Sequence, residues 1–218
     1  MVLTLYEIEK MTPKDIRKIY GLMPCDRQIK FDGYCFDKDK RLCAAAYILL
    51  LYGIYLADGV LCRKLQFTYG EYGKPALIGF PNLHFNLTHC SRGVACAISR
   101  TAIGIDIQNI DEYDASLVRT VMSPEEQQII SESRIPEVMF MRIWTCKESY
   151  LKFVGTGIDD DLAKLSFPQR ENRFYANNCY FSLNEHAGCV ITLCESNCAH
   201  HETINLDADM ISDFLSKI

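Results

Sequence analysis

The interpretation of this chain starts from the stretch Trp144-Thr145-Cys146-Lys147-Glu148-Ser149-Tyr150-Leu151-Lys152. In a helix, Trp144, Glu148 and Lys152 stand four residues apart and lie along one side. A carboxylate and an ammonium group would then sit one turn apart, beside the only tryptophan of the chain. Taken alone, Glu148 and Lys152 are equally consistent with a solvated helix pair, which stabilises a helix by ~0.3 kcal/mol.

A second polar motif, Gly104-Ile105-Asp106-Ile107-Gln108, lies upstream. In a strand, Asp106 and Gln108 point to one face and the isoleucines to the other. Asp106 and Glu148 together could hold a hard cation such as magnesium, which takes one or two protein carboxylates and fills its other positions with water and phosphate oxygens. The alternative for Asp106 is a polar residue that simply ends a strand.

Composition limits the function classes. The chain has 218 residues, of which 49% are hydrophobic, and a formal net charge of −5. This size suits one large domain or two closely packed halves, and the negative charge argues against nucleic acid or an anionic membrane as a partner. Eleven cysteines without a repeating spacing, and no signal peptide before them, predict reduced thiols in a cytoplasmic protein. The apolar segment 42–57 is shorter than the ~20 residues of a membrane span and predicts a buried core helix.

Two helix starts share one signature, a hydroxyl cap followed by proline and an acid, at Thr12-Pro13-Lys14-Asp15 and Ser123-Pro124-Glu125-Glu126. A short polar helix is expected over 26–31, and further helices are predicted over 37–51, 115–122, 136–154 and 207–215. Strands are predicted over 1–7, 61–68, 83–87, 94–99, 103–107, 164–167, 180–183 and 188–194.

Gly-Ile-Asp-Ile-Gln followed by Trp-x-x-Lys-Glu-Ser-x-x-Lys resembles the paired signature of the 4′-phosphopantetheinyl transferases. The chain length and the late position of the first motif resemble the large single-chain, surfactin-synthetase-activating branch, which serves peptide and polyketide synthases. The resemblance implies an α+β fold, a pseudo-dimer of two related α/β halves. These halves would span residues 1–101, the nucleotide side of the site, and 102–218, with the metal and catalytic motifs.

The resemblance also implies a reaction. A serine hydroxyl of an apo acyl or peptidyl carrier protein attacks the β-phosphate of coenzyme A, takes its 4′-phosphopantetheine arm and releases adenosine 3′,5′-bisphosphate. Such a holo-[acyl-carrier-protein] synthase depends on Mg²⁺ and acts mainly through positioning and charge neutralisation. Because a pseudo-dimer completes its site within one chain, a monomer is expected.

Carried over residue by residue, the metal ligands are Asp106 and Glu148, with Gln108 where relatives often have glutamate. An amide oxygen can coordinate a cation but adds no negative charge, so direct ligation, ligation through water and no ligation stay open for Gln108. Lys152 would neutralise charge on the bridging and leaving oxygens. Glu148 would take the serine proton, directly or through a water on the metal.

The expected coenzyme A contacts lie mostly in the first half. Thr88 and His89 match a family motif that hydrogen-bonds the pyrophosphate, and 73–75, Gly-Lys-Pro, matches a loop that lies against the nucleotide. Basic residues match those that hold the 3′-phosphate, although a solvated basic helix face is the alternative. The complete coenzyme A set is Arg27, Lys30, Arg41, Lys74, Pro75, Thr88, His89 and Lys152.

Two further residues and one segment match the family without a settled role. Glu126 is either a distant metal ligand or a structural acid at a helix start, and Lys147 matches a family lysine that could pair with a carboxylate. The segment 112–122, which contains Arg119, corresponds to the place where relatives meet the carrier protein.

Cysteines and histidines near the C-terminus could bind a zinc ion as an alternative metal site. Cysteines five residues apart in a strand, however, point to opposite faces. This possible zinc set is Cys189, Cys194, Cys198, His200 and His201. Two rival functions also remain: a non-catalytic module that binds coenzyme A or a carrier protein, and a magnesium-dependent hydrolase of nucleotides or pyrophosphates.

Overall fold

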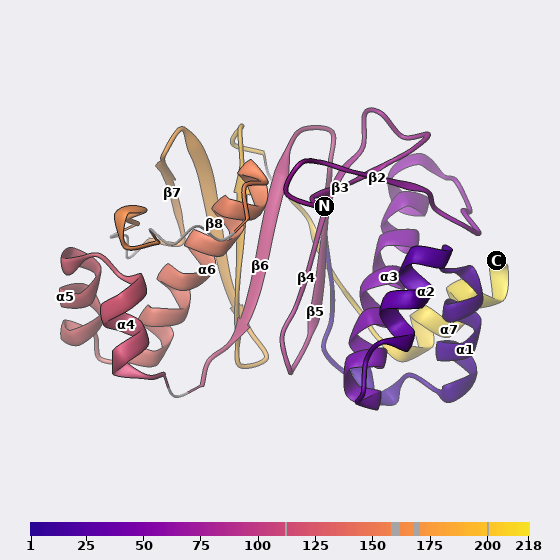
Figure 1. Ribbon diagram of the computed structural model, residues 1–218, viewed down its shortest axis with the longest axis horizontal. Coiled ribbons are helices and arrows are strands. Elements are labelled where there is room, and N and C mark those ends of the chain that lie inside the picture. Colours follow the sequence, from indigo (N-terminus) through magenta and orange to yellow (C-terminus); the bar gives the residue numbers. More distant parts are fainter. Residues whose placement is uncertain (112, 158–161, 168–170, 200) are drawn as a thin grey trace.

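Two four-stranded sheets lie at the centre of the molecule, and each carries a long helix on its outer face (Figure 1). This computed structural model describes residues 1–111, 113–157, 162–167, 171–199 and 201–218. Apolar side chains of both sheets form a cluster between them, which includes Val2, Ala97, Ile105 and Leu193. The α+β class expected from the resemblance is confirmed, whereas the relatedness of two halves stays a prediction.

The sheets and helices use most of the described chain. The strands are β1 (Val2–Leu5), β2 (Phe67–Tyr69), β3 (Pro75–Leu77), β4 (His84–His89), β5 (Val94–Ser99), β6 (Ile103–Asn109), β7 (Arg173–Ala176), β8 (Cys179–His186), β9 (Cys189–Glu195) and β10 (Thr203–Leu206). The α-helices are α1 (Pro13–Leu22), α2 (Cys25–Asp32), α3 (Asp37–Asp58), α4 (Ala115–Val121), α5 (Pro124–Glu132), α6 (Pro136–Val154) and α7 (Ala208–Lys217). Two short 3₁₀ helices are η1 (Ile8–Lys10) and η2 (Leu162–Lys164).

The first layer is the sheet β10-β1-β5-β4 with α3 packed on its outer side. Helices α1, α2 and α7 lie beyond α3 and cover it from solvent (Figure 1). The capping box predicted at Thr12 is present, since its hydroxyl accepts from Asp15 N and the Asp15 carboxylate accepts from Thr12 N. The matching box at Ser123 and Glu126 is present as well.

Helix α3 is the buried core helix that the segment 42–57 predicts. By length and composition alone it could cross a membrane, but ten of its residues, Leu49 and Leu50 among them, are buried inside the protein. Gly53 permits the close approach to the sheet, because a Cβ atom there would lie 2.2 Å from the Ile98 side chain. The helix runs past the predicted end at Leu51 and stops where Gly59 takes φ = 70°.

The second layer is the antiparallel sheet β6-β9-β8-β7, on which α6 packs against β6 and β9. Gly104 of β6 makes this contact possible. A Cβ atom at residue 104 would lie 2.1 Å from the Ser149 carbonyl oxygen and 2.5 Å from Phe153 N. The glycine of the Gly-Ile-Asp motif therefore lets α6 lie directly over β6, which brings Glu148 and Lys152 to Asp106.

Three sequence predictions need correction. Of the strand predicted over 61–68, only its end is paired, because Leu65 N donates to the Tyr47 hydroxyl at 3.3 Å instead of to a sheet. The strand predicted over 164–167 is absent among the described residues. Phe167 N donates to Glu126 Oε1 at 2.6 Å, and the side chain of Phe167 is buried.

The third correction concerns the proposed halves. Residues 203–217 fall in the predicted C-terminal half of 102–218, yet β10 pairs in parallel with β1 and α7 contacts α1. The C-terminal segment therefore crosses back and completes the first layer, where the unpaired edge of β1 accepts it. The division at residue 101 itself stays a prediction.

Candidate active site

Asp106 of β6 is the centre of a polar cluster between the two layers. The residue is 1% exposed, and its Oδ1 accepts hydrogen bonds from Thr88 Oγ1 at 2.8 Å and from Lys152 Nζ at 2.5 Å. Lys152 also donates to Thr88 Oγ1 at 3.1 Å. The structure thus brings together one residue each from β4, β6 and α6, as the sequence motifs predicted.

Glu148 lies one turn before Lys152 on α6, as the spacing requires. It is 9% exposed, and its Oε1 is buried without a hydrogen-bond partner among the described residues. Burial raises the pKa of the Glu148 carboxyl, the charge of Asp106 raises it further, and Lys152 partly offsets both effects. A buried carboxylate oxygen without a partner is costly unless another group comes to it, so this oxygen points to a ligand that completes the site.

Gln108 extends the same face of β6. Its Nε2 donates to Asp106 Oδ2 at 3.1 Å, so the amide nitrogen is already used and Oε1 is the atom left for a ligand. Gln108 could therefore coordinate a metal ion, directly or through a water, only through Oε1.

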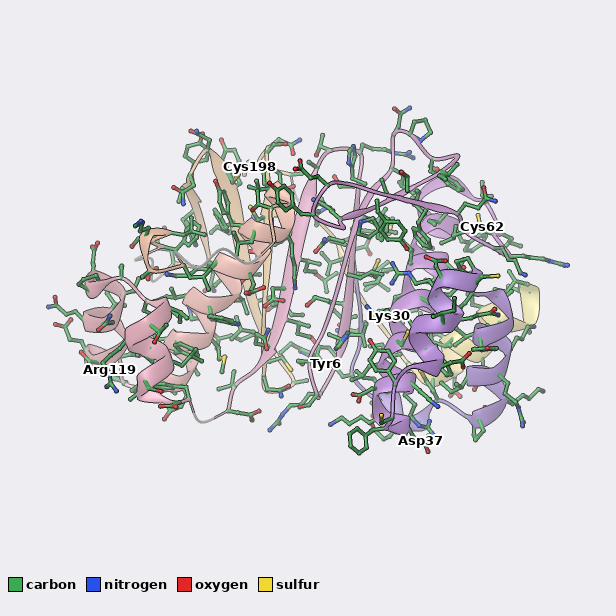
Figure 2. The ribbon with its side chains drawn as sticks, viewed as in Figure 1. Tyr6, Lys30, Asp37, Cys62, Arg119 and Cys198 are labelled. Carbon is green, nitrogen blue, oxygen red and sulfur yellow. The ribbon has the colours of Figure 1, made fainter. Side chains whose placement is uncertain are left out.

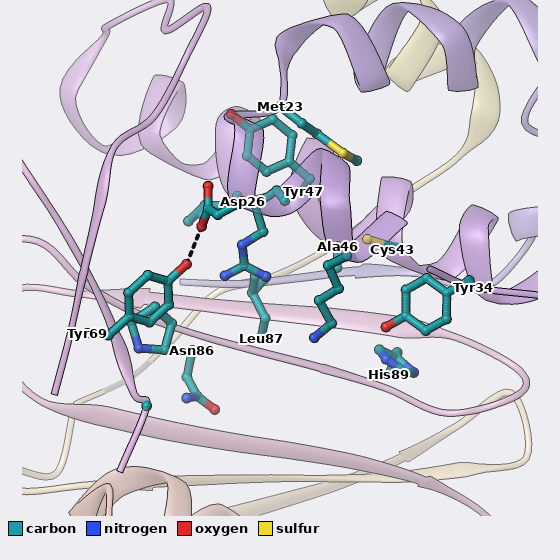
Figure 3. A pocket seen from close by; sticks show the side chains of 15 residues that line it. Met23, Asp26, Tyr34, Cys43, Ala46, Tyr47, Tyr69, Asn86, Leu87 and His89 are labelled. Carbon is teal, nitrogen blue, oxygen red and sulfur yellow. Dashed lines mark hydrogen bonds between the residues drawn. The ribbon is translucent and has the colours of Figure 1, made fainter. Parts of the chain in front are cut away.

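A cavity of about 430 Å³ lies beside this cluster, between α2, α3 and β4 (Figure 3). Its lining includes Arg27, Lys30, Pro75 and His89, four of the residues expected to bind coenzyme A. Partial burial lowers the pKa of the His89 imidazole, and the ammonium groups of Lys30 and Lys152 lower it further. The cavity is therefore basic on one side, which fits an anionic ligand.

A second cavity, of about 320 Å³, lies next to the first and shares four lining residues with it, Gly73, Pro75, Asn86 and Leu87. Its other walls are formed by the reactive side of α6, with Glu148 and Lys152. An anion in the first cavity can thus extend directly to the carboxylate cluster.

Two predicted coenzyme A contacts make hydrogen bonds within the protein, although Lys74 also lines the second cavity beside Glu148 and Lys152. Lys74 Nζ donates to the Phe153 carbonyl at 2.8 Å and so caps the end of α6, while burial lowers the pKa of its ammonium group. Arg41 donates through Nη1 to the Met11 carbonyl and lines a different cavity with Tyr6 and Arg92. Arg41 is two residues from Cys43, which faces the first cavity, and two helical residues point in nearly opposite directions.

Glu126 and Lys147 belong to a separate, structural cluster. Their ion pair measures 2.7 Å, and neither side chain has exposed surface. Glu126 also accepts from Ser123 N and Phe167 N, and Lys147 donates to the carbonyl of Val121. These bonds tie α4, α5 and α6 together and favour the structural interpretation of Glu126.

The structure separates the remaining sequence candidates from the site. Arg119 lies on α4, at the end of the molecule opposite Lys30 (Figure 2). Residue 112 of the predicted carrier segment lies outside the described residues, as does His200 of the possible zinc set. Within the described chain no three metal-binding side chains cluster, and Cys189 and Cys194 pack into different apolar clusters, as their spacing predicts.

Two residues of the site had no role assigned from sequence. Asn86 is 8% exposed, and its Oδ1 accepts from Ile105 N at 3.1 Å, which ties β4 to β6 across the two layers. Tyr69 donates from its hydroxyl to Asp26 and closes one wall of the first cavity (Figure 3). Asn86 lies two residues before Thr88 in the sequence Phe85-Asn86-Leu87-Thr88-His89, so its nearness to that predicted motif was the available signal.

Comparison with known proteins agrees with this geometry. Residues 102–200 match a family described as the 4′-phosphopantetheinyl transferase superfamily, and this range contains Asp106, Glu148 and Lys152. Over this range the chain is similar to the 4′-phosphopantetheinyl transferase superfamily. The residues that match the superfamily motifs are those that the fold gathers around Asp106.

Several curated proteins of the superfamily are similar to this chain. A 4′-phosphopantetheinyl transferase of Bacillus subtilis is 31% identical over 113 residues, which are 50% of each chain. The transferase psf-1 of Bacillus pumilus is 25% identical over 72% of this chain and 69% of its own. The transferase gsp of Aneurinibacillus migulanus is 38% identical over 46% of this chain and 40% of its own. The chain thus spans half the length of the first of these relatives.

Proposed function

We propose that the protein transfers the 4′-phosphopantetheine arm of coenzyme A to a serine of an apo acyl or peptidyl carrier protein. The observation that carries the proposal is the adjacency of two cavities that share four lining residues, one basic and one lined by Glu148 and by Lys152, which bonds to Asp106. The curated relatives are named for this activity, which supports its extension to this chain.

Magnesium fits the residues at the end of the second cavity. Asp106 and Glu148 supply two carboxylates, the donor type that this ion takes from proteins, and the partnerless Glu148 Oε1 is free to coordinate. Gln108 Oε1 would be a third, neutral ligand. When bound, the ion supplies positive charge to the pyrophosphate oxygens. Positive charge would then be present at both ends of the coenzyme A site, from the ion and Lys152 at one end and from Arg27 and Lys30 at the other.

The reaction needs a base, a charge partner and a fixed geometry. The carrier serine Oγ forms a bond to the β-phosphorus while the bond to the bridging oxygen breaks, and adenosine 3′,5′-bisphosphate leaves with the electron pair. The Glu148 carboxylate accepts the serine proton, a role that a raised carboxyl pKa favours. Lys152 neutralises the leaving phosphate, and Thr88 and His89 orient the pyrophosphate.

The setting of the reaction is also a proposal. Eleven free thiols support a reducing compartment such as the cytoplasm. A site built entirely from one chain supports a monomer, and the burial of α3 among the other elements supports a function without a membrane anchor. The carrier would belong to fatty-acid, polyketide or peptide synthesis.

Intact-mass spectrometry tests the proposed function. The chain is mixed with coenzyme A, magnesium and an apo carrier protein, and samples with Glu148→Gln or without metal run beside it. We expect the carrier to gain the mass of one phosphopantetheine arm in the complete mixture alone. Coenzyme A binding without any mass gain, on several unrelated carriers, would contradict the transferase and favour the binding module. Release of phosphopantetheine or phosphate without a carrier would favour the hydrolase.

A further inference from the structure

Two cysteine side chains from different layers lie against each other at one end of the molecule. Cys90 follows β4 in the turn to β5, and Cys189 is the first residue of β9. Their Sγ atoms are 3.8 Å apart, although 99 residues separate them in sequence. Cys90 is 8% exposed and Cys189 is fully buried.

The two thiols differ in their surroundings. The contact with the Cys189 thiol and hydrogen bonds from the backbone N–H groups of Arg92 and Gly93 lower the pKa of Cys90 to about 7, against the effect of burial. The same contact and burial raise the pKa of Cys189. The thiol with solvent contact is thus also the better thiolate, as in an attacking cysteine with a resolving partner behind it.

Closing the gap between the two sulfurs requires a small movement of the turn that carries Cys90, because Cys189 is paired on both sides within its sheet. A disulfide needs an S–S distance of ~2.05 Å, so the Sγ atoms must close the rest of the gap. Cys90 lies in a tight turn, closed by Cys90 N donating to the Gly93 carbonyl at 2.9 Å, and Ser91 and Arg92 at its tip are exposed. The tip is held to the same side of the molecule by Asn109 Nδ2, which donates to Ser91 Oγ, and by the ion pair of Arg92 with Asp111, so a shift of the turn must carry these contacts along.

We propose that Cys90 and Cys189 form a reversible disulfide, a redox-modification site that joins the two layers of the fold. The oxidant is a small disulfide such as glutathione disulfide. The Cys90 thiolate attacks one of its sulfurs and releases one thiol. Cys189 then loses its proton and displaces the second thiol from the mixed disulfide, so two protein thiols lose two protons and two electrons to the oxidant.

The disulfide would lie next to the candidate site, at a place where residues of both layers contribute to it. His89 directly precedes Cys90, and Asn109, which pairs with Cys189, directly follows Gln108. A cross-link here fixes the phosphate side of the site to the metal side. It also closes a long loop, and the loss of chain entropy in the unfolded state predicts a thermal midpoint higher by roughly 10 °C. This site does not depend on the proposed transferase function.

A second thiol pair provides the control. Cys179 and Cys194 interact within the apolar cluster between β8, β9 and α6, inside a single layer. Both are buried, and burial raises the pKa of both thiols. Cys179→Ser therefore removes a thiol from a comparable environment without touching the inter-layer contact.

The test incubates the full chain in glutathione redox buffers, blocks free thiols and maps disulfide-linked peptides by mass spectrometry. We expect a Cys90–Cys189 peptide, loss of two hydrogens, a raised thermal midpoint and complete reversal by dithiothreitol. Cys90→Ser and Cys189→Ser should each abolish the midpoint shift, whereas Cys179→Ser should retain it. If Cys189→Ser does not fold, Cys90→Ser decides, and the conservative change Cys90→Ala is measured beside it because this side chain is also buried.

Three results would overturn the proposal. They are a glutathione adduct that stays on Cys90 without cross-linking, a Cys179–Cys194 bond as the only product, and free Cys90 and Cys189 thiols after the exposed cysteines have reacted.

Discussion

Lys147 and Glu126 form an ion pair of 2.7 Å in which neither side chain has exposed surface. Lys147 stands directly before Glu148 in the sequence, yet its ammonium group points away from the active-site cluster, to the carbonyls of Val121 and Leu162. Consecutive residues of one motif thus serve two purposes, since one orders the helices around α6 and the next faces the cavity.

Removing one partner of this pair leaves a buried charge without compensation. We expect Glu126→Gln or Lys147→Met to reduce the free energy of unfolding by roughly 3–5 kcal/mol, measured by urea denaturation. The double variant should lose less than the sum of the two single losses. Additive losses would contradict the ion pair. A Glu126→Gln protein of unchanged stability that binds magnesium more weakly would make Glu126 a metal ligand.

Gly104 is required by the contact between β6 and α6. A methyl group at this position meets the backbone of Ser149 and Phe153, which cannot rotate away as a flexible side chain could. We expect Gly104→Ala to destabilise the fold by about 1–3 kcal/mol, through overpacking. The matched control is Gly21→Ala in α1, where nothing lies within 4 Å and alanine favours the helix, so its midpoint should rise. Equal effects of the two changes would contradict this packing.

Arg27 and Arg41 provide a test of the cavity assignment. Arg27 lines the first cavity, stacks over the Phe67 ring at 5.0 Å and has a buried Nε without a partner in the described chain, whereas Arg41 bonds to the Met11 carbonyl. We expect Arg27→Ala to weaken coenzyme A binding by about tenfold to a hundredfold, since charged hydrogen bonds contribute ~1.5–3 kcal/mol. Arg41→Ala should change it little.

Calorimetry with coenzyme A and 3′-dephospho-coenzyme A checks this assignment. The Arg27 penalty should nearly vanish for the dephospho compound. A larger penalty for Arg41→Ala than for Arg27→Ala would restore the prediction made from sequence.

His89 predicts a pH dependence of stability. Its pKa is lowered in the folded protein, first by partial burial and then by Lys30 and Lys152, while the unfolded chain keeps the ordinary value of ~6.5. The unfolded state therefore binds the proton more readily, so His89 lowers stability as pH falls below ~6.5 and adds no further loss below its folded pKa. Above ~6.5 both states are neutral and the contribution disappears.

Proton NMR of the His89 ring measures this pKa directly, and His89→Gln gives the baseline for unfolding experiments between pH 8 and pH 5. A ring pKa at or above 6.5 in the free protein would contradict the account. An added polyphosphate ligand should move the pKa upward, because a nearby anion favours the imidazolium.

The local chemistry of the chain predicts much of this structure. Capping boxes at Thr12 and Ser123, the start of α6 at Pro136 and its stop at Gly155 follow from residues that act within one turn. The meeting of Asp106, Glu148 and Lys152 followed from motif resemblance together with the strand and helix periods. These features need no knowledge of distant neighbours.

What the sequence could not predict depends on long-range pairing. The parallel pairing of β10 with β1 joins residues at opposite ends of the chain, and no periodicity encodes its partner. Phe167 lacks a strand because a glutamate in α5 accepts its N–H. That Arg41 bonds to the Met11 carbonyl and lines a cavity other than the first was also beyond prediction, because family correspondence gives a residue type and not the direction in which its helix face points.

The most direct measurement of the central claim counts both products of a single reaction. Adenosine 3′,5′-bisphosphate and modified carrier protein are quantified in the same sample by chromatography and mass spectrometry, with and without carrier. The account predicts equal amounts of the two products with carrier, neither product without carrier, and loss of both in Glu148→Gln. Nucleotide release that does not require the carrier, or that exceeds carrier modification, would contradict transfer to a protein serine.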